Sequence, residues 1–163
     1  MKLNVERVEL VGFKNSARSV EGRTMNPEER ARINERLAKY MGWESLSIYF
    51  SEDNDCWLDE IEGFNHLVHP ADAKKLKAGH SFKDTNLRFV PTDYTTDLVA
   101  VMEVSQEICA RQNCFYILVG SDIMFDMRFE EIGGVWKTPE SSGQSEAEAI
   151  ARACYEAIGE GEE

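Results

Sequence analysis

Basic residues are scarce in this chain, and the scarcity limits what the chain binds. Its 163 residues include 18 Lys and Arg against 30 Asp and Glu, which gives a formal charge of −12. Binding nucleic acid through a general phosphate footprint requires clustered Lys and Arg, and so does binding an anionic membrane surface. The composition argues against both. It leaves open a basic protein partner, or a small anion held in a local positive pocket.

Cysteines and long apolar runs are also few. The four cysteines have no CxxC spacing and are not dense enough for a disulfide scaffold. No apolar run approaches the length of a membrane-spanning helix, and the N-terminus lacks the apolar centre of a signal peptide. We therefore expect a protein of the reducing cytoplasm.

Catalytic motifs are missing as well. The sequence contains no Gly-x-Ser-x-Gly elbow and no Gly-rich phosphate loop. Cys56 and the three histidines His66, His69 and His80 lack the paired spacing of a zinc site, so we interpret the histidines as surface residues. We expect no metal and no cofactor, and the sequence leans against an enzyme.

The stretch from Pro91 to Cys109 contains the chain's central predicted helix. Thr95 and Thr96 precede an apolar-periodic run, which is typical of a helix start, and Asp97 adds a favourable charge in the first turn. Residues at three- and four-residue steps then form one stripe, which leaves Val104 to the side: Leu98, Val101, Met102, Ser105, Ile108 and Cys109.

Two more helices have clear boundaries. Asn26 followed by Pro27 predicts a helix start, and Gly42 predicts its end. Near the C-terminus, Ser145 and Glu148 have capping-box spacing, and the apolar positions after them predict a helix over 145–158.

Strands are predicted on both sides of the central helix. Leu46–Phe50 is a short candidate, and the apolar run Cys114–Val119 suits a strand covered on both faces. Alternation over 123–130 and a third segment, Val135–Lys137, complete an antiparallel meander. The expected class is α+β, an antiparallel sheet between helices.

The predicted organisation is one domain over 26–163. Residues 1–25 form a leader, read either as an edge strand or as a flexible extension. Residues 51–88 interrupt the regular pattern and contain too few apolar residues for a core of their own. We interpret them as a long insertion after the first helix and short strand.

Four segments resemble successive blocks of the phage ABA-sandwich proteins, small bacteriophage proteins of mostly undescribed function. The segments are NERLAKYMGWE, PTDYTTDLVAVMEV, FYILVGSDIMFDMRF and SEAEAIARACYEAIG. The resemblance implies a sheet held between helices and a viral protein acting inside a bacterial host cell. It implies no reaction.

A nucleotide-sized ligand requires aromatic faces for its base and cationic groups for its phosphate. The chain offers both, and we predict ligand contacts from residues near the start of the central helix and from the insertion: Trp43, Trp57, Tyr94, Asp97, Arg128 and Trp136.

The leading hypothesis is a non-catalytic, homo-oligomeric phage protein that counters host defence by sequestering a nucleotide-derived immune signal of the cyclic or ADP-ribose type. Two alternatives remain. One is an acidic decoy that binds a host protein, and the other is a phosphodiesterase-like enzyme.

Overall fold

The computed structural model describes residues 24–83, 86–88, 92–134 and 136–159, so the predicted leader falls almost entirely outside the described residues. The described residues form four α-helices and two antiparallel sheets, which confirms the α+β class. The chain divides into two compact units. We call Asn34–Asp93 the small unit and the described residues of Met1–Ile33 and Tyr94–Glu163 the large unit.

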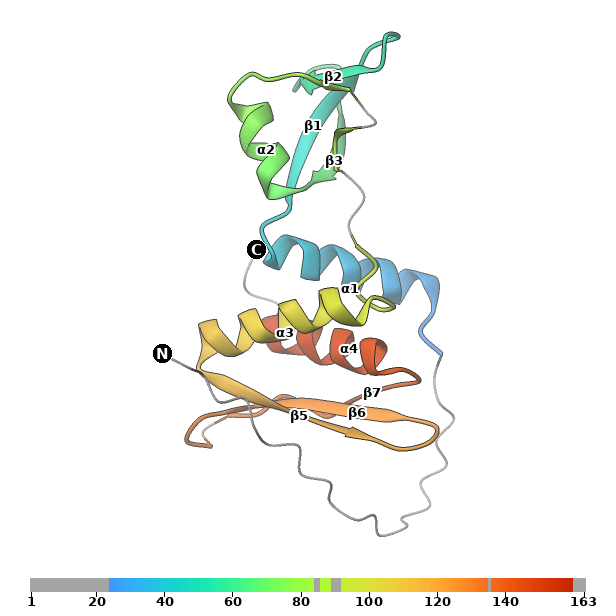
Figure 1. Cartoon of the computed structure of the whole chain (residues 1–163), viewed down its shortest axis with the longest axis vertical. Helices are drawn as coiled ribbons and strands as arrows, with labels where there is room; N and C mark the ends of the chain where they lie inside the picture. The colour runs from blue at the N-terminus through green and yellow to red at the C-terminus, as the bar shows by residue number, and fades with distance from the viewer. Residues whose placement is uncertain (1–23, 84–85, 89–91, 135, 160–163) are drawn as a thin grey trace. The chain divides into compact units, whose positions relative to one another are not determined.

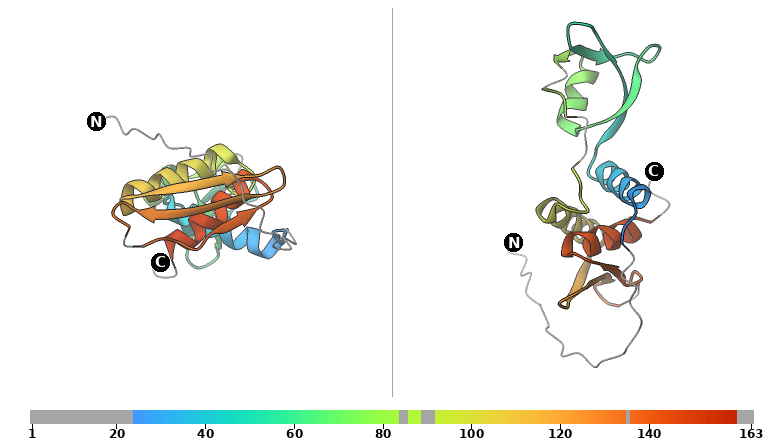
Figure 2. Two further views of the ribbon diagram at one scale, coloured as in Figure 1. Left: turned by 90° about the horizontal axis from the view of Figure 1, so that it is seen from below. Right: turned by 90° about the vertical axis from the view of Figure 1, so that its right-hand side faces the viewer.

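The large unit is a three-stranded sheet packed against helices. Its strands lie in the order β5-β6-β7, all antiparallel. Two helices, α3 and α4, lie on the same face of this sheet (Figures 1 and 2). The elements are β5 (Cys114–Gly120), β6 (Phe125–Glu131), β7 (Ser141–Gly143), α3 (Leu98–Gln112) and α4 (Glu146–Ile158). The expected meander and its packing on helices are therefore present.

Helix ends in the large unit follow the capping chemistry of the sequence. Ser145 Oγ accepts a hydrogen bond from the Glu148 backbone N–H at 3.2 Å, and Gly159 ends α4 with φ +71°. The start of α3 differs from the prediction. Asp97 is the N-cap residue, with its Oδ1 accepting from Ala100 N at 3.0 Å, while Thr95 and Thr96 lie in the preceding turn.

Two predicted details of the large unit are wrong. Val104, which was predicted to lie beside the apolar stripe, is fully buried. Helix α3 packs against both α4 and β5, so a wider part of its surface is buried than one packing partner would bury. The third strand is β7. In the predicted segment, Val135 lies outside the described residues, and Lys137 makes an isolated bridge to Glu130. Backbone hydrogen bonds do join this segment to β6, from Glu131 N to Trp136 O at 3.0 Å and from Thr138 N to Phe129 O at 2.9 Å. The strand that pairs with β6 over three residues comes later and ends at Gly143, which packs closely against the backbone of α4.

The small unit contains a four-stranded antiparallel sheet and one helix, α2. Its strands lie in the order β3-β1-β2-β4, and α2 covers one face (Figure 1). The elements are β1 (Glu44–Phe50), β2 (Asp55–Leu58), β3 (Phe64–Val68), α2 (Pro70–Lys77) and β4 (Phe82–Lys83). Only β1 was predicted.

Helix α1 (Pro27–Tyr40) precedes β1, and the boundary between the two units falls within it. Its predicted start is confirmed, because Asn26 Oδ1 accepts a hydrogen bond from Glu29 N at 2.8 Å. The predicted stop is confirmed too. Gly42 has φ +89°, a left-handed conformation that a residue with a Cβ adopts only with strain.

The expectation that residues 51–88 have no core is wrong. A cluster of buried apolar residues joins the sheet to α2: Ile48, Cys56, Val68, Ala73, Leu76 and Leu87. Burial of each large aliphatic side chain contributes about 1.5–3 kcal/mol to folding. These residues are sparse along the chain, but strand alternation and the helix bring them onto one surface.

Among the described residues, no helix has both the length and the apolarity needed to cross a bilayer.

Candidate functional site

An exposed aromatic pair lies on the sheet of the small unit. Tyr49 on β1 and Trp57 on β2 are direct cross-strand partners, and their ring centroids are 5.1 Å apart with an interplanar angle of 38°. Trp57 is 38% exposed and Tyr49 is half-buried. A large apolar ring left in water beside a second ring is a ready stacking surface.

The pair faces away from α2. Ile48 and Cys56, the neighbours of the two aromatics in sequence, point into the core shared with α2, so Tyr49 and Trp57 point to the other side. Asp55 lies two residues before Trp57 and therefore shares its face, and its cross-strand partner is Lys83 on β4. The face thus combines two rings with one cation and one carboxylate.

A tight turn borders this face. The turn from Asp59 to Gly63 connects β2 to β3, and Gly63 packs so closely that an added Cβ would lie 2.7 Å from Ser47 Oγ. Asp59 Oδ1 accepts hydrogen bonds from Ile61 N at 2.9 Å and Glu62 N at 3.1 Å. These hydrogen bonds lower the pKa of Asp59 below its ordinary value, and the bond from Glu62 N has the larger effect. The hydrogen bonds to Asp59 thus order the loop that borders this face.

Of this group, only Trp57 was predicted as a ligand contact. A signal for the rest was present in the sequence: SEDND is rich in turn residues and stands between two short apolar segments, which indicates a β-hairpin. In the structure, Asn54 takes φ +63° in that turn. The hairpin sets Tyr49 opposite Trp57.

Trp43, the other predicted contact in the small unit, lies at the end of α1. Its backbone N–H donates to Ala38 O at 3.0 Å, and its half-buried ring meets His69 edge-on at 5.3 Å. His69 is the N-cap of α2, where Nδ1 accepts from Ala71 N. Trp43 thus packs against a structural residue, in keeping with a ring that folds back over a helix end.

The predicted residues at the start of α3 have local structural roles. Tyr94 is only 5% exposed. Asp97 is exposed and caps the helix. Arg128 lies on the other side of the sheet, because its neighbours Met127 and Phe129 are buried on the face that carries α3 and α4. The structure does not gather Tyr94, Asp97 and Arg128 into one site.

The guanidinium of Arg128 already has carboxylate partners. Nε lies 2.8 Å from Glu130 Oε1, and Nη1 lies 3.2 Å from Glu140 Oε2. The Glu130 hydrogen bond is the main reason that the pKa of Arg128 is raised. Trp136 is half-buried, and its carbonyl accepts from Glu131 N at 3.0 Å. An anion would have to compete with two carboxylates for this arginine.

The residues considered as metal ligands have separate structural contacts. His66 meets the ring of Phe50 edge-on at 5.3 Å, and Cys56 belongs to the core of the small unit. Within the described residues, no group of three or more His, Cys, Asp or Glu side chains has the arrangement to hold a metal ion.

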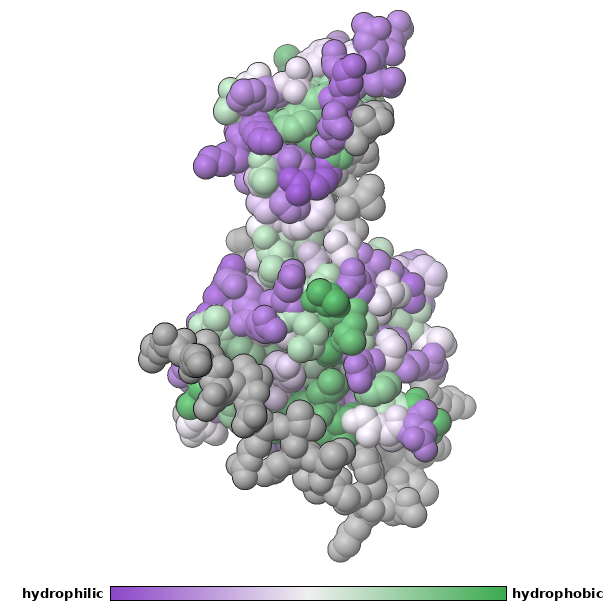
Figure 3. All heavy atoms as spheres, in the orientation of Figure 1, coloured by the Kyte–Doolittle hydropathy of each residue, from purple (hydrophilic) through white to green (hydrophobic). Residues whose placement is uncertain are grey.

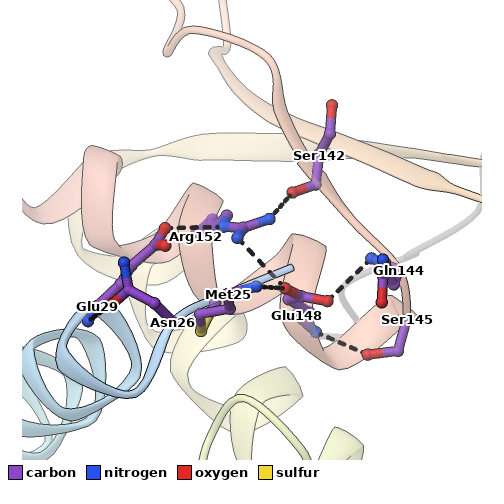
Figure 4. Close-up of polar contacts among 8 residues, drawn as sticks. All are labelled: Met25, Asn26, Glu29, Ser142, Gln144, Ser145, Glu148 and Arg152. Carbon is purple, nitrogen blue, oxygen red and sulfur yellow. Dashed lines mark hydrogen bonds and ion pairs between the residues drawn. The ribbon is translucent and has the colours of Figure 1, made fainter. Parts of the chain in front are cut away.

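The densest polar network is in the large unit, shown in Figure 4. Arg152 on α4 donates to Glu29 Oε1 at 3.0 Å and to Ser142 O at 2.5 Å, and it forms an ion pair with Glu148 at 3.3 Å. Glu148 in turn accepts from Met25 N at 3.2 Å. The two α4 side chains thus hold Met25 and the first turn of α1 against α4.

An open hollow of about 400 Å³ lies beside this network and is lined by Asn26, Glu28, Glu29 and Arg32. Arg32 stacks over the ring of Tyr155, with its guanidinium carbon 5.4 Å from the centroid. The lining has two carboxylates and one cation. The nearby Arg152 already binds Glu29, Ser142 and Glu148 of the chain. We therefore interpret this region as structural and take the Tyr49–Trp57 face as the candidate site.

Comparison of the chain with protein-family models, with curated proteins and with solved structures finds no match in any of the three.

Proposed function

We propose that this chain is a non-catalytic binding protein that holds a nucleotide-derived ligand on the open sheet face of its small unit. The observation that carries the proposal is the stacked pair of half-buried Tyr49 and exposed Trp57, with Lys83 on the same face. The proposal keeps Trp57 from the predicted contacts and adds Tyr49 and Lys83.

Stacking chemistry explains the preference for a nucleotide. A base stacked on an aromatic side chain is worth about 1–3 kcal/mol, with little dependence on base identity. Lys83 supplies a point charge for a phosphate oxygen. The formal charge of −12 disfavours a long polyanion, whereas a single nucleotide brings only a few charges to the face.

The biological setting that we propose follows from the sequence resemblance. A phage protein in the cytoplasm of a bacterial host that binds a cyclic or ADP-ribose-type signal without cleaving it would remove that signal from host defence. A homo-oligomer suits this role, since two subunits present two binding faces.

The experiment is binding of a panel of cyclic and ADP-ribose-type nucleotides, measured first by native mass spectrometry and then by titration calorimetry. We expect Trp57→Ala to weaken binding roughly 5- to 150-fold, the equivalent of about 1–3 kcal/mol. Phe64→Ala is the matched control, because Phe64 is 75% exposed and its cross-strand partner Ile48 faces the core side of the same sheet. Equal affinity of Trp57→Ala and the wild type would refute the site.

The fate of the ligand separates binding from catalysis. After heat denaturation, the bound nucleotide should be released with its original mass. Recovery of a hydrolysed product would establish an enzyme instead and would contradict the non-catalytic proposal.

A second candidate, the acidic decoy, is favoured by charge in the same unit. The two turns that flank β2 carry exposed carboxylates: Glu52, Asp53, Glu60 and Glu62. A decoy would ignore nucleotides and would capture a basic host protein in a salt-sensitive way. Nucleotide binding that is insensitive to a Glu60→Gln, Glu62→Gln double variant would exclude these carboxylates from the ligand site.

A further inference from the structure

Strand β5 has one paired edge and one open edge. It pairs with β6 along seven residues, and no other strand of the described residues pairs with it. The strand reads CFYILVG and contains neither a charged residue nor a proline. Soluble proteins protect edge strands with such residues, because the unpaired N–H and C=O groups of an uncharged edge recruit another strand.

Apolar side chains accompany this edge on both faces of the sheet. On the face away from the helices, Phe115 is 43% exposed, and Ile117 and Val119 are half-buried. On the helix face, Tyr116 and Leu118 are half-buried. Figure 3 shows apolar side chains at the surface of the large unit near α3. Contiguous apolar surface of this kind marks an interaction site.

We infer that two copies of this chain join edge to edge through β5, in antiparallel orientation with Ile117 on the two-fold axis. This register sets Phe115 of one copy opposite Val119 of the other, and Tyr116 opposite Leu118. It turns two three-stranded sheets into one continuous six-stranded sheet. The interface is isologous, so each copy contributes the same strand.

The charge of the chain is compatible with a second copy that is paired in this way. Each chain carries a formal charge of −12, so self-association requires an interface that keeps carboxylates apart. The nearest charged row on the outer face is on β6: Asp126, Arg128 and Glu130. With strands about 4.8 Å apart, the two β6 rows are separated by three strand spacings, about 14 Å. That separation exceeds the Debye length of about 8 Å at physiological salt, so repulsion between the rows is largely screened.

The test is the mass of the full chain in solution, by light scattering over a dilution series and by native mass spectrometry. We expect a species of twice 18.6 kDa. Ile117→Lys and Ile117→Glu should each yield monomers, because each places like charges opposite one another. An equimolar mixture of the two variants should restore a dimer that contains one copy of each.

Ile61→Lys is the control, since Ile61 is 93% exposed and belongs to the small unit, whereas β5 belongs to the large unit. It should remain dimeric. Cooperative thermal unfolding must persist in each variant. Phe115→Lys is the second variant if Ile117→Lys does not fold, because its side chain is more exposed.

Three results would overturn the inference. They are a monomeric wild-type chain, a dimer that survives both charged substitutions at Ile117, and a mixture of the two variants that stays monomeric. A wild-type monomer that dimerises only after deletion of residues 1–23 would show that those residues occupy the edge, and it would equally reject the second copy as the native partner.

Discussion

The carboxylate of Asp72 on α2 binds the guanidinium of Arg88 through two hydrogen bonds. Arg88 Nε donates to Oδ2 at 2.9 Å and Nη2 donates to Oδ1 at 3.0 Å, while the Arg88 backbone N–H donates to Oδ2 at 3.1 Å. The side chain of Asp72 is only 4% exposed. In return, the carbonyl of Arg88 accepts from His69 N at 2.8 Å. Asp72 therefore fixes the chain after β4 onto α2.

Stability of the small unit should depend on pH through Asp72. The Arg88 hydrogen bond is the main reason that the pKa of Asp72 lies below its ordinary value of 3.8. A depressed carboxyl pKa stabilises the fold above the unfolded pKa, and this contribution is lost as pH falls through the folded pKa. We expect Asp72→Asn to lower the free energy of unfolding by about 1–3 kcal/mol at pH 7 and by clearly less at pH 3.

Urea denaturation of both proteins at the two pH values measures this difference. Asp53→Asn is the control, since Asp53 is an exposed turn residue. If the Asp72→Asn penalty is the same at pH 7 and pH 3, the ion pair is not its cause.

Gly143 is expected to tolerate no side chain. A Cβ at this buried β7 position would lie 2.4 Å from Ala149 N and 2.9 Å from the Glu148 carbonyl carbon, both of which are backbone atoms of α4. Relief requires the strand and the helix to separate, so Gly143→Ala should cost about 1–3 kcal/mol. For a chain of this size, the melting temperature should fall by roughly 2–12 °C. Ser142→Ala, at the exposed neighbouring position, should have a smaller effect; an unchanged melting temperature for Gly143→Ala would contradict the close packing.

Cys109 should be almost unreactive in the folded protein. Partial burial, helped by the neighbouring Cys114, raises the pKa of Cys109 to about 12. At pH 8 the reactive thiolate is then a fraction on the order of 10⁻⁴ of the thiol. We expect iodoacetamide followed by peptide mass spectrometry to leave Cys109 unmodified under native conditions and to label it in 6 M guanidinium, roughly the strength that unfolds stable domains. Native labelling of Cys109 at the rate of a free cysteine would contradict its burial.

Local sequence signals were sufficient for the helix ends. Asn26, Gly42, Ser145 and Gly159 act within a few residues of their own position, through one hydrogen bond or one backbone conformation. Such interactions are encoded by neighbouring residues, so they can be predicted without knowing the fold. The capping box at Ser145 was half correct. Its Oγ caps the helix, but the Glu148 carboxylate accepts from Gln144 N and Met25 N instead of turning back to Ser145.

The candidate site depended on tertiary pairing. Trp57 could be named from the sequence as a candidate ligand contact, whereas Tyr49 and Lys83 acquire their roles only because β1, β2 and β4 align in one register. Arg128 is the opposite case. It was predicted from the sequence as a ligand contact, but it is engaged by two carboxylates of the chain.

The sequence by itself determined the acidic charge, the boundaries of α1 and α4 and the antiparallel strands after the central helix. Tertiary structure alone decided that residues 51–88 belong to a core, that β7 is the third strand of the large sheet, and which aromatics remain exposed. The physical reason is the distance along the sequence over which each interaction acts. Caps and periodicity act between near neighbours, whereas burial and ion pairing depend on residues that are brought together from distant parts of the chain.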